Sequence, residues 1–343
     1  MTVARSQLVD VDVTRYYHCI SRCVRGARLC GEGAEHRKQW IEDRLEKLSG
    51  CFAVSVCGFA VMDNHLHLLL RLDVDEASSW SAEEVIRRWA VAYPPKTVLG
   101  KEIEITQAWI DLHAKDKKRI ELLRERLQSL GWFMKALKEP LARMANKEDE
   151  CKGTFWEGRY KSIAILDEEA LLVTCAYIDL NPLAAGIAAT PETSRHTSIR
   201  RRVRHAKAEG KLYKLKPSRS GRVTHSRARD VEEKLWLCPV EDRRRRGSAR
   251  EGMLEGFSLG NYLLLVDYTS RLHRQGKARV SREVASIFDR LQTNADTWGH
   301  RIERLFERTR LLGNYFSTNV ARLRELAQNR GLHHLDNLTA SPG

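Results

Sequence analysis

Two histidines separated by one residue are the first candidates for chemistry in this chain. His65 and His67 lie in the segment HLHLLLRL, where they alternate with leucines. In a β-strand, residues i and i+2 point to the same face, so both imidazoles point one way and Leu66, Leu68 and Leu70 point the other. Two imidazoles on one face can share one cation, so the pattern predicts a metal site. Two ordinary surface histidines are the alternative.

A tyrosine and an asparagine four residues apart form the second candidate. Tyr177 and Asn181 lie in the segment AYIDLNP, at the end of a predicted helix that Asp167 caps, that runs to about Leu180 and that Pro182 ends. Residues four apart share one face of a helix. The core side of this helix is expected to consist of Leu171, Leu172, Cys175 and Ile178. A tyrosine at the edge of the core, beside a capping asparagine, is the alternative.

Together the two features indicate metal-assisted nucleophilic chemistry. A phenol is a weak nucleophile at its ordinary pKa near 10. It becomes useful where a divalent ion polarises the electrophile and stabilises the developing charge. Two histidines plus one oxygen donor leave positions open for phosphate oxygens and water, as Mg²⁺ or Mn²⁺ sites do. Tyr160 is a rival nucleophile, but its neighbours Arg159 and Lys161 favour a role in phosphate positioning or base stacking.

The elements that must position these residues read as an α+β fold. Strands are expected over 16–23, 53–62, 65–72 and 155–166, and helices over 36–48, 81–92 and 167–180. This order predicts a ferredoxin-like antiparallel sheet with helices on one face. A helical insertion is expected at about 96–150, with helices over 117–130 and 132–146.

The chain divides into three expected parts. Residues 1–194 form the catalytic domain, 195–230 a basic linker or DNA-contacting segment, and 231–343 a helical accessory domain. Helices of the accessory domain are expected over 253–268, 281–291 and 296–312.

Charge is concentrated in one short segment. The chain has a formal net charge of +14, and residues 195–229 hold 13 Lys/Arg against the single acid Glu209. Such a segment attracts a polyanion, nucleic acid first, although a solvated flexible linker is the alternative. The expected nucleic-acid contacts are Arg159, Lys161, Arg200, Arg201, Arg202 and Arg204.

Weaker expectations concern scattered arginines and tryptophans. Four arginines could contact phosphates or could simply be ordinary surface residues: Arg22, Arg25, Arg28 and Arg71. Base stacking or core packing would explain Trp89, Trp132 and Trp156.

Cysteine spacing and hydropathy indicate the cellular compartment in which the protein is expected. The eight cysteines include no CxxC pair, so reduced, mostly buried thiols are expected. No apolar run reaches the roughly 18 residues of a membrane helix, and the first residues lack the apolar core of a signal peptide. We therefore expect a soluble cytoplasmic protein with no membrane partner.

Three motifs in order carry a resemblance to a known family. The runs DNHLHLLL, FWEGRYKS and AYIDLNPLAAG resemble the single-tyrosine HUH transposases, especially the REP-associated tyrosine transposases, over about residues 14–200. The resemblance implies that His65 and His67 bind the divalent metal, with Asn181 as the third ligand. It implies that Tyr177 attacks the scissile phosphate, forming a 5′-phosphotyrosine and leaving a free 3′-hydroxyl.

The resemblance also implies partners. Family members recognise hairpins in single-stranded DNA and often form homodimers, so both are expected of this chain. Two other functions remain open from the residues alone. One is a nucleic-acid-binding regulator without catalysis, and the other is a metal-dependent nuclease that uses water and forms no covalent intermediate.

Overall fold

The fold is built around one mixed sheet. The computed structural model describes residues 9–211, 232, 234–242, 252–275, 293–308, 315–319 and 326. The main sheet contains β1 (Tyr16–Arg22), β2 (Val54–Val61), β3 (His65–Leu72), β4 (Lys161–Ile165) and β7 (Tyr315–Phe316). A two-stranded sheet pairs β5 (Glu241–Asp242) with β6 (Leu254–Glu255).

Helices in the first half of the chain are mostly short. They are η1 (Val24–Gly26), α2 (His36–Ser49), α3 (Val74–Ser78), α4 (Ala82–Ala92), α5 (Gln107–His113), α6 (Lys117–Leu127) and α7 (Leu130–Glu148). The second half contributes α8 (Glu168–Ala184), η2 (Pro191–Thr193), α9 (Ser198–Ala208), α10 (Leu259–Gln275) and α12 (Ala295–Arg308). The α+β class is therefore confirmed, and helices α5, α6 and α7 lie within about 96–150, although the status of this range as an insertion stays a prediction.

The strand order brings the first and third strands side by side. The order is β2-β3-β1-β4-β7, antiparallel throughout except for the parallel β4–β7 pair. In the β1–β3 register, Ile20 lies opposite His67 and Arg22 lies opposite His65. The ferredoxin-like arrangement itself stays a prediction.

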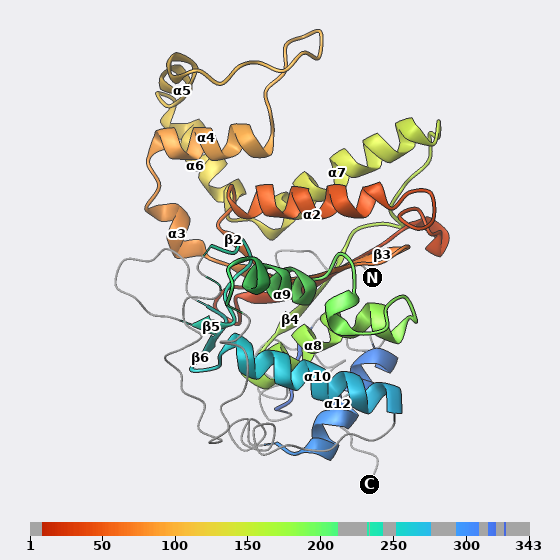
Figure 1. The fold of residues 1–343 in the computed structure, drawn as a ribbon. Helices are drawn as coiled ribbons and strands as arrows, with labels where there is room; N and C mark the ends of the chain where they lie inside the picture. Colours follow the sequence, from red (N-terminus) through yellow and green to blue (C-terminus); the bar gives the residue numbers. More distant parts are fainter. Residues whose placement is uncertain are drawn as a thin grey trace.

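Both faces of the sheet are covered, which corrects the expectation of helices on one face (Figure 1). Leu66, Leu68 and Leu70 pack on one face with apolar residues of α2 and α7. On the other face, Ile20 and Leu69 pack under α8. The reason is that the second face is also largely apolar, so it too needs a covering layer.

The helix α8 is buried between the sheet and later helices. Asp167 caps it as expected, accepting a hydrogen bond from the Ala170 backbone N at 2.8 Å. Residues 170–183 are all buried, as in a helix that is apolar on every side. Pro182 does not end the helix, so that expectation is wrong. Termination occurs at Gly186 (φ +70°), whose N–H bonds to Leu183 in the usual glycine C-cap pattern.

Other sequence expectations fare unevenly. The strand predicted over 155–166 is shorter, because only Lys161–Ile165 pairs as β4. Helices α10 and α12 lie within the predicted accessory domain, but β7 joins the main sheet. The whole expected helix over 281–291 and residues 212–231, which include the rest of the basic segment, lie outside the described residues. The domain boundaries stay a prediction.

Most cysteine side chains are buried, as the sequence predicts. All eight cysteines are free, and each is buried except Cys151. Among the described residues, no helix is both long and apolar enough to span a membrane.

A buried ion pair holds α9 in place. Arg202 is 1% exposed and pairs with Glu232. Its guanidinium also donates to the carbonyls of Cys57 and Cys238 at 2.9 and 2.8 Å. This arginine therefore ties α9 to strand β2 and to the segment that precedes β5.

Replacing this arginine should cost stability. Arg202→Ala leaves the Glu232 carboxylate buried and unpaired, so the free energy of unfolding should fall by about 3–5 kcal/mol. Urea titration measures it. The matched control Arg204→Ala, exposed on the same helix, should change stability by less than about 0.5 kcal/mol. Equal effects of the two substitutions would refute this role for Arg202.

Candidate metal and nucleophile site

Strand alternation places the two predicted histidines on the face under α8. His67 is 2% exposed and His65 is half-buried. Their ring centroids lie 4.8 Å apart. The imidazoles therefore converge as the sequence predicts, but on a covered face rather than an open one.

Helix α8 brings Tyr177 and Asn181 to the same place. The Tyr177 ring centroid lies 5.4 Å from that of His67, at an interplanar angle of 88°. The Asn181 Nδ2 lies 3.5 Å from Nε2 of His67, and the same amide hydrogen-bonds to His65. One turn of α8 thus positions the amide between two imidazoles and the phenol against one of them.

A third histidine joins the group, and sequence analysis missed it. His18 on β1 is 1% exposed, and its Nε2 lies 2.9 Å from Nδ1 of His67. Its ring centroid is 5.9 Å from that of Tyr177. Within the segment YYHCISRC, alternation places His18 on one face with Ile20, but only the β1–β3 register reveals the partner.

The contact from His18 fixes which nitrogen of His67 faces the helix. Because Nδ1 of His67 is held by His18, Nε2 points to Asn181. Hydrogen bonding at one ring nitrogen sets the tautomer and orients the other for ligation. His65 is oriented similarly, with its Nδ1 2.6 Å from the Asn64 Oδ1.

Burial keeps these imidazoles neutral. Desolvation lowers the pKa of His18 to about 3, with a smaller contribution from the Lys161 charge. Desolvation, helped by the charge of Arg22, lowers the pKa of His65 to about 4. The pKa of His67 falls well below its ordinary value, mainly because of desolvation and secondly because of electrostatic repulsion from His18 and His65. Neutral imidazoles keep the lone pairs that a metal ion needs.

The donor set fits a divalent cation through three groups. Two imidazole nitrogens and the Asn181 amide oxygen can face one ion once the amide presents that atom. No cluster of three or more His, Cys, Asp or Glu side chains suited to a metal ion occurs within the described ranges. The amide is therefore the third donor that the arrangement offers, and its neutrality suits a site that must also accept a phosphate.

The expected nucleic-acid contacts lie in different environments. Arg159 and Arg204 are exposed. Lys161 and Arg200 are half-buried. The half-buried Arg201 pairs with Glu46 at 2.7 Å.

Arg202 is wrong as a nucleic-acid contact, because its charge is buried in the Glu232 pair. Arg22, by contrast, is exposed beside the site. The pKa of Lys161 is lowered mainly by desolvation, and the charge of Arg22 lowers it further. Arg22 and Lys161 therefore supply positive charge next to the imidazoles.

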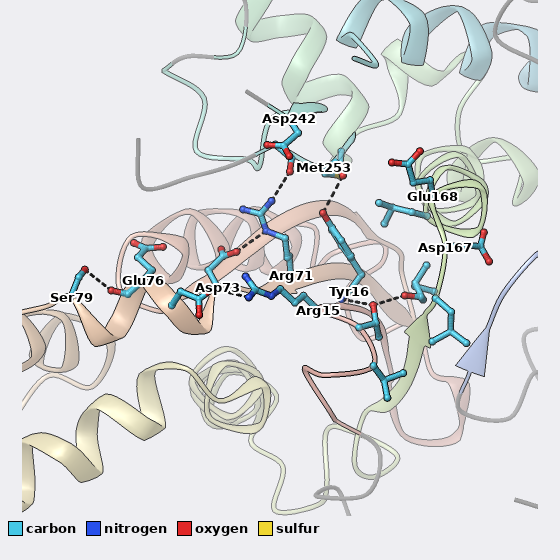
Figure 2. A pocket seen from close by; sticks show the side chains of 17 residues that line it. Arg15, Tyr16, Arg71, Asp73, Glu76, Ser79, Asp167, Glu168, Asp242 and Met253 are labelled. Carbon is cyan, nitrogen blue, oxygen red and sulfur yellow. Dashed lines mark hydrogen bonds and ion pairs between the residues drawn. The ribbon is translucent and has the colours of Figure 1, made fainter. Parts of the chain in front are cut away.

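A separate cavity of about 780 Å³ lies at the other end of the same sheet face (Figure 2). Asp73, Asp75, Glu76 and Glu168 line it together with Arg15 and Arg71. Arg71 donates to Asp73 and to the Gly252 carbonyl, both at 2.6 Å. Its charge is thus already used, and the surplus of carboxylates makes this cavity unsuitable for phosphate.

Comparisons with known proteins give one distant likeness. No family model matches the chain, and no curated protein matches it. Among solved structures, the chain is similar to a REP-associated tyrosine transposase bound to a REP hairpin. The identity is 11%, the TM-score is 0.34, and the match covers 56% of this chain and 79% of that one. A likeness this distant assigns neither family nor activity.

Removing the His18 contact should weaken metal binding without removing a ligand. In His18→Phe, the His67 ring loses the partner of Nδ1, so Mn²⁺ affinity should fall about 10–100-fold by calorimetry. His18→Gln keeps a polar atom near that position and should restore most of the affinity. Nitrogen NMR of His67 should report an Nδ1–H tautomer in the parent protein and a mixture in the Phe variant. Unchanged affinity in His18→Phe would remove this role.

The buried imidazoles should also make stability depend on pH. Folding lowers the pKa of His18 from the ordinary 6.5 to about 3, and that of His65 from 6.5 to about 4. At a pH between the folded and unfolded pKa of each group, the unfolded chain therefore binds more protons than the folded one. The contribution is complete above about pH 6.5 and is lost as pH falls toward 4, by up to about 1.4 kcal/mol per pH unit for each group. Metal-free urea unfolding at about pH 7 and pH 5 measures it. The dependence should be shallower in His18→Gln, and identical slopes would contradict the assignment.

Proposed function

We propose that this chain is a transposase-like enzyme that cleaves and rejoins single-stranded DNA through a 5′-phosphotyrosine, with Mg²⁺ or Mn²⁺. The observation that carries the proposal is the packing of the Tyr177 ring against His67 while the Asn181 amide contacts both histidines. Two of the three motifs that resemble single-tyrosine HUH transposases, DNHLHLLL and AYIDLNPLAAG, supply these same four residues. The ferredoxin-like arrangement of the four antiparallel strands is part of this proposal.

Each residue has a distinct task in the proposed reaction. His65, His67 and Asn181 would hold the metal, which when bound polarises the scissile phosphate. Arg22 and Lys161 attract the DNA backbone. The Tyr177 oxygen attacks phosphorus and loses its proton, the bond from phosphorus to the 3′ oxygen breaks, and that oxygen gains a proton. Attack by a 3′-hydroxyl on the phosphotyrosine reverses these steps and rejoins a strand.

The burial of the tyrosine adds a requirement. Tyr177 is 4% exposed, so a DNA phosphate reaches its hydroxyl only after a side-chain or helix movement. Helix α8 packs against α10 and α12 (Figure 1). We therefore place the opening step at the contacts between α8 and these helices, and hairpin or repeat DNA is the substrate class that the motif resemblance implies.

The direct test is covalent capture of DNA. The parent protein, incubated with labelled single-stranded hairpin DNA and Mn²⁺, should give a protein–DNA adduct on a denaturing gel, and a chelator should abolish it. Tyr177→Phe should lose the adduct at least about 10³-fold while still binding DNA. Tyr160→Phe, the matched control, should keep it.

Other outcomes identify other functions. Cleavage that leaves a free 5′-phosphate and no attached protein would establish a water-dependent nuclease instead. Tight hairpin binding without cleavage in either ion would establish a regulator. An adduct that persists in Tyr177→Phe would exclude this residue as the nucleophile.

A further inference from the structure

A groove beside α7 combines tryptophans with positive charge. Its volume is about 550 Å³, and it lies between α7 and the segment that leads into β4. Its lining includes Trp132, Trp156, Lys135, Lys138 and Arg159. None of these residues belongs to the metal and nucleophile site.

The cations of the groove lie over the indole rings. The Lys135 ammonium is 4.7 Å from the centre of Trp132, and the Lys138 ammonium is 5.0 Å from that of Trp156. The Arg126 guanidinium also lies over Trp132, 4.3 Å from the ring centre. Flat aromatic surfaces interleaved with flexible cations suit a ligand with stacked rings and negative charge.

The charge balance of the groove is positive. Glu139 is the acidic residue of its lining, and Arg143 already binds that carboxylate at 2.7 Å. Lys135 is 52% exposed on its side chain and lies 4.0 Å from the same carboxylate, at the limit of an ion pair. Lys135 and the exposed Arg159 are therefore available to phosphates.

Backbone contacts connect the groove to the catalytic end of the sheet. Trp156 forms a bridge with Cys23, and the Glu157 N–H donates to the Arg22 carbonyl at 2.9 Å. Arg22 lies opposite His65 in the β1–β3 register. A DNA strand that leaves the groove along this segment would therefore reach the end of β1, where Arg22 lies opposite His65.

We propose that this groove binds single-stranded DNA that flanks the scissile phosphate, with bases stacked on Trp132 and Trp156 and phosphates on Lys135 and Arg159. The choice of DNA as the ligand rests on the proposed function. A duplex fits poorly, because its bases are already stacked on one another and cannot reach the indoles.

Binding measurements in Tyr177→Phe protein without divalent ions test the groove apart from catalysis. The probe is a labelled single-stranded oligonucleotide of about 12 nucleotides. Adding Lys135→Glu and Arg159→Glu should weaken binding roughly tenfold or more, and should reduce the slope of log affinity against log salt by about 0.7 for each lost phosphate contact. The control pair Lys117→Glu and Lys118→Glu changes the net charge equally at exposed positions of α6, and should have little effect.

Stacking is tested at Trp132. Trp132→Leu should lose about tenfold in affinity, and Trp132→Phe should recover most of it, because a phenyl ring still stacks while packing changes are similar. Circular dichroism checks that both variants fold. Should either variant misfold, quenching of indole fluorescence by the oligonucleotide in the parent protein gives the same answer.

The outcomes separate this inference from the proposed function. If the groove pair behaves like the control pair, or if duplex of the same length binds as tightly as single strand, the groove is not the binding site, whether or not the parent forms an adduct. If no adduct forms but the groove variants lose affinity, the catalytic proposal fails and the groove stands.

Discussion

The register between β1 and β3 is the constraint on which the site depends. It places His18 beside His67 and Arg22 beside His65, on the face that α8 covers. A shift of one residue would turn every imidazole to the opposite face, among the leucines that pack on α2. The apolar packing of both sheet faces therefore fixes the register, and the register fixes the position of each nitrogen. The geometry of the proposed catalytic site is in this sense a consequence of core packing.

Burial gives the site its chemistry and also limits it. Neutral imidazoles under α8 keep their lone pairs available for a cation. At a solvent-exposed imidazole, which has a higher pKa, a cation would have to compete with protons for the same lone pair. The same burial covers Tyr177, so the proposed reaction requires a movement of the helical layer before a substrate can enter. The buried Asp179 on α8 bonds to Ser198 and Tyr262, at 2.6 and 2.5 Å, so this helix is tied to α9 and α10 at one point. These hydrogen bonds connect α8 to α9 and α10, so a movement of one helix can affect the others.

Local patterns predicted the parts of the site that lie within single elements. Alternation in HLHLLLRL paired His65 with His67, and helical spacing paired Tyr177 with Asn181. Non-local facts escaped prediction for a physical reason. The role of His18 depends on strand pairing across 49 residues, and Arg202 looked like one more basic residue until its pairing with Glu232 was visible. The second helical layer was missed because the apolar residues of that face, such as Ile20, Leu69 and Ile163, come from strands that are far apart in the sequence.

Pulsed electron paramagnetic resonance of bound Mn²⁺ addresses the central arrangement most directly. The account predicts coupling to two imidazole nitrogens in the parent protein, to one nitrogen after His67→Ala, and a perturbed spectrum after Asn181→Ala. A spectrum with water protons alone, unchanged by either substitution, would contradict the claim that these side chains surround one cation beside Tyr177.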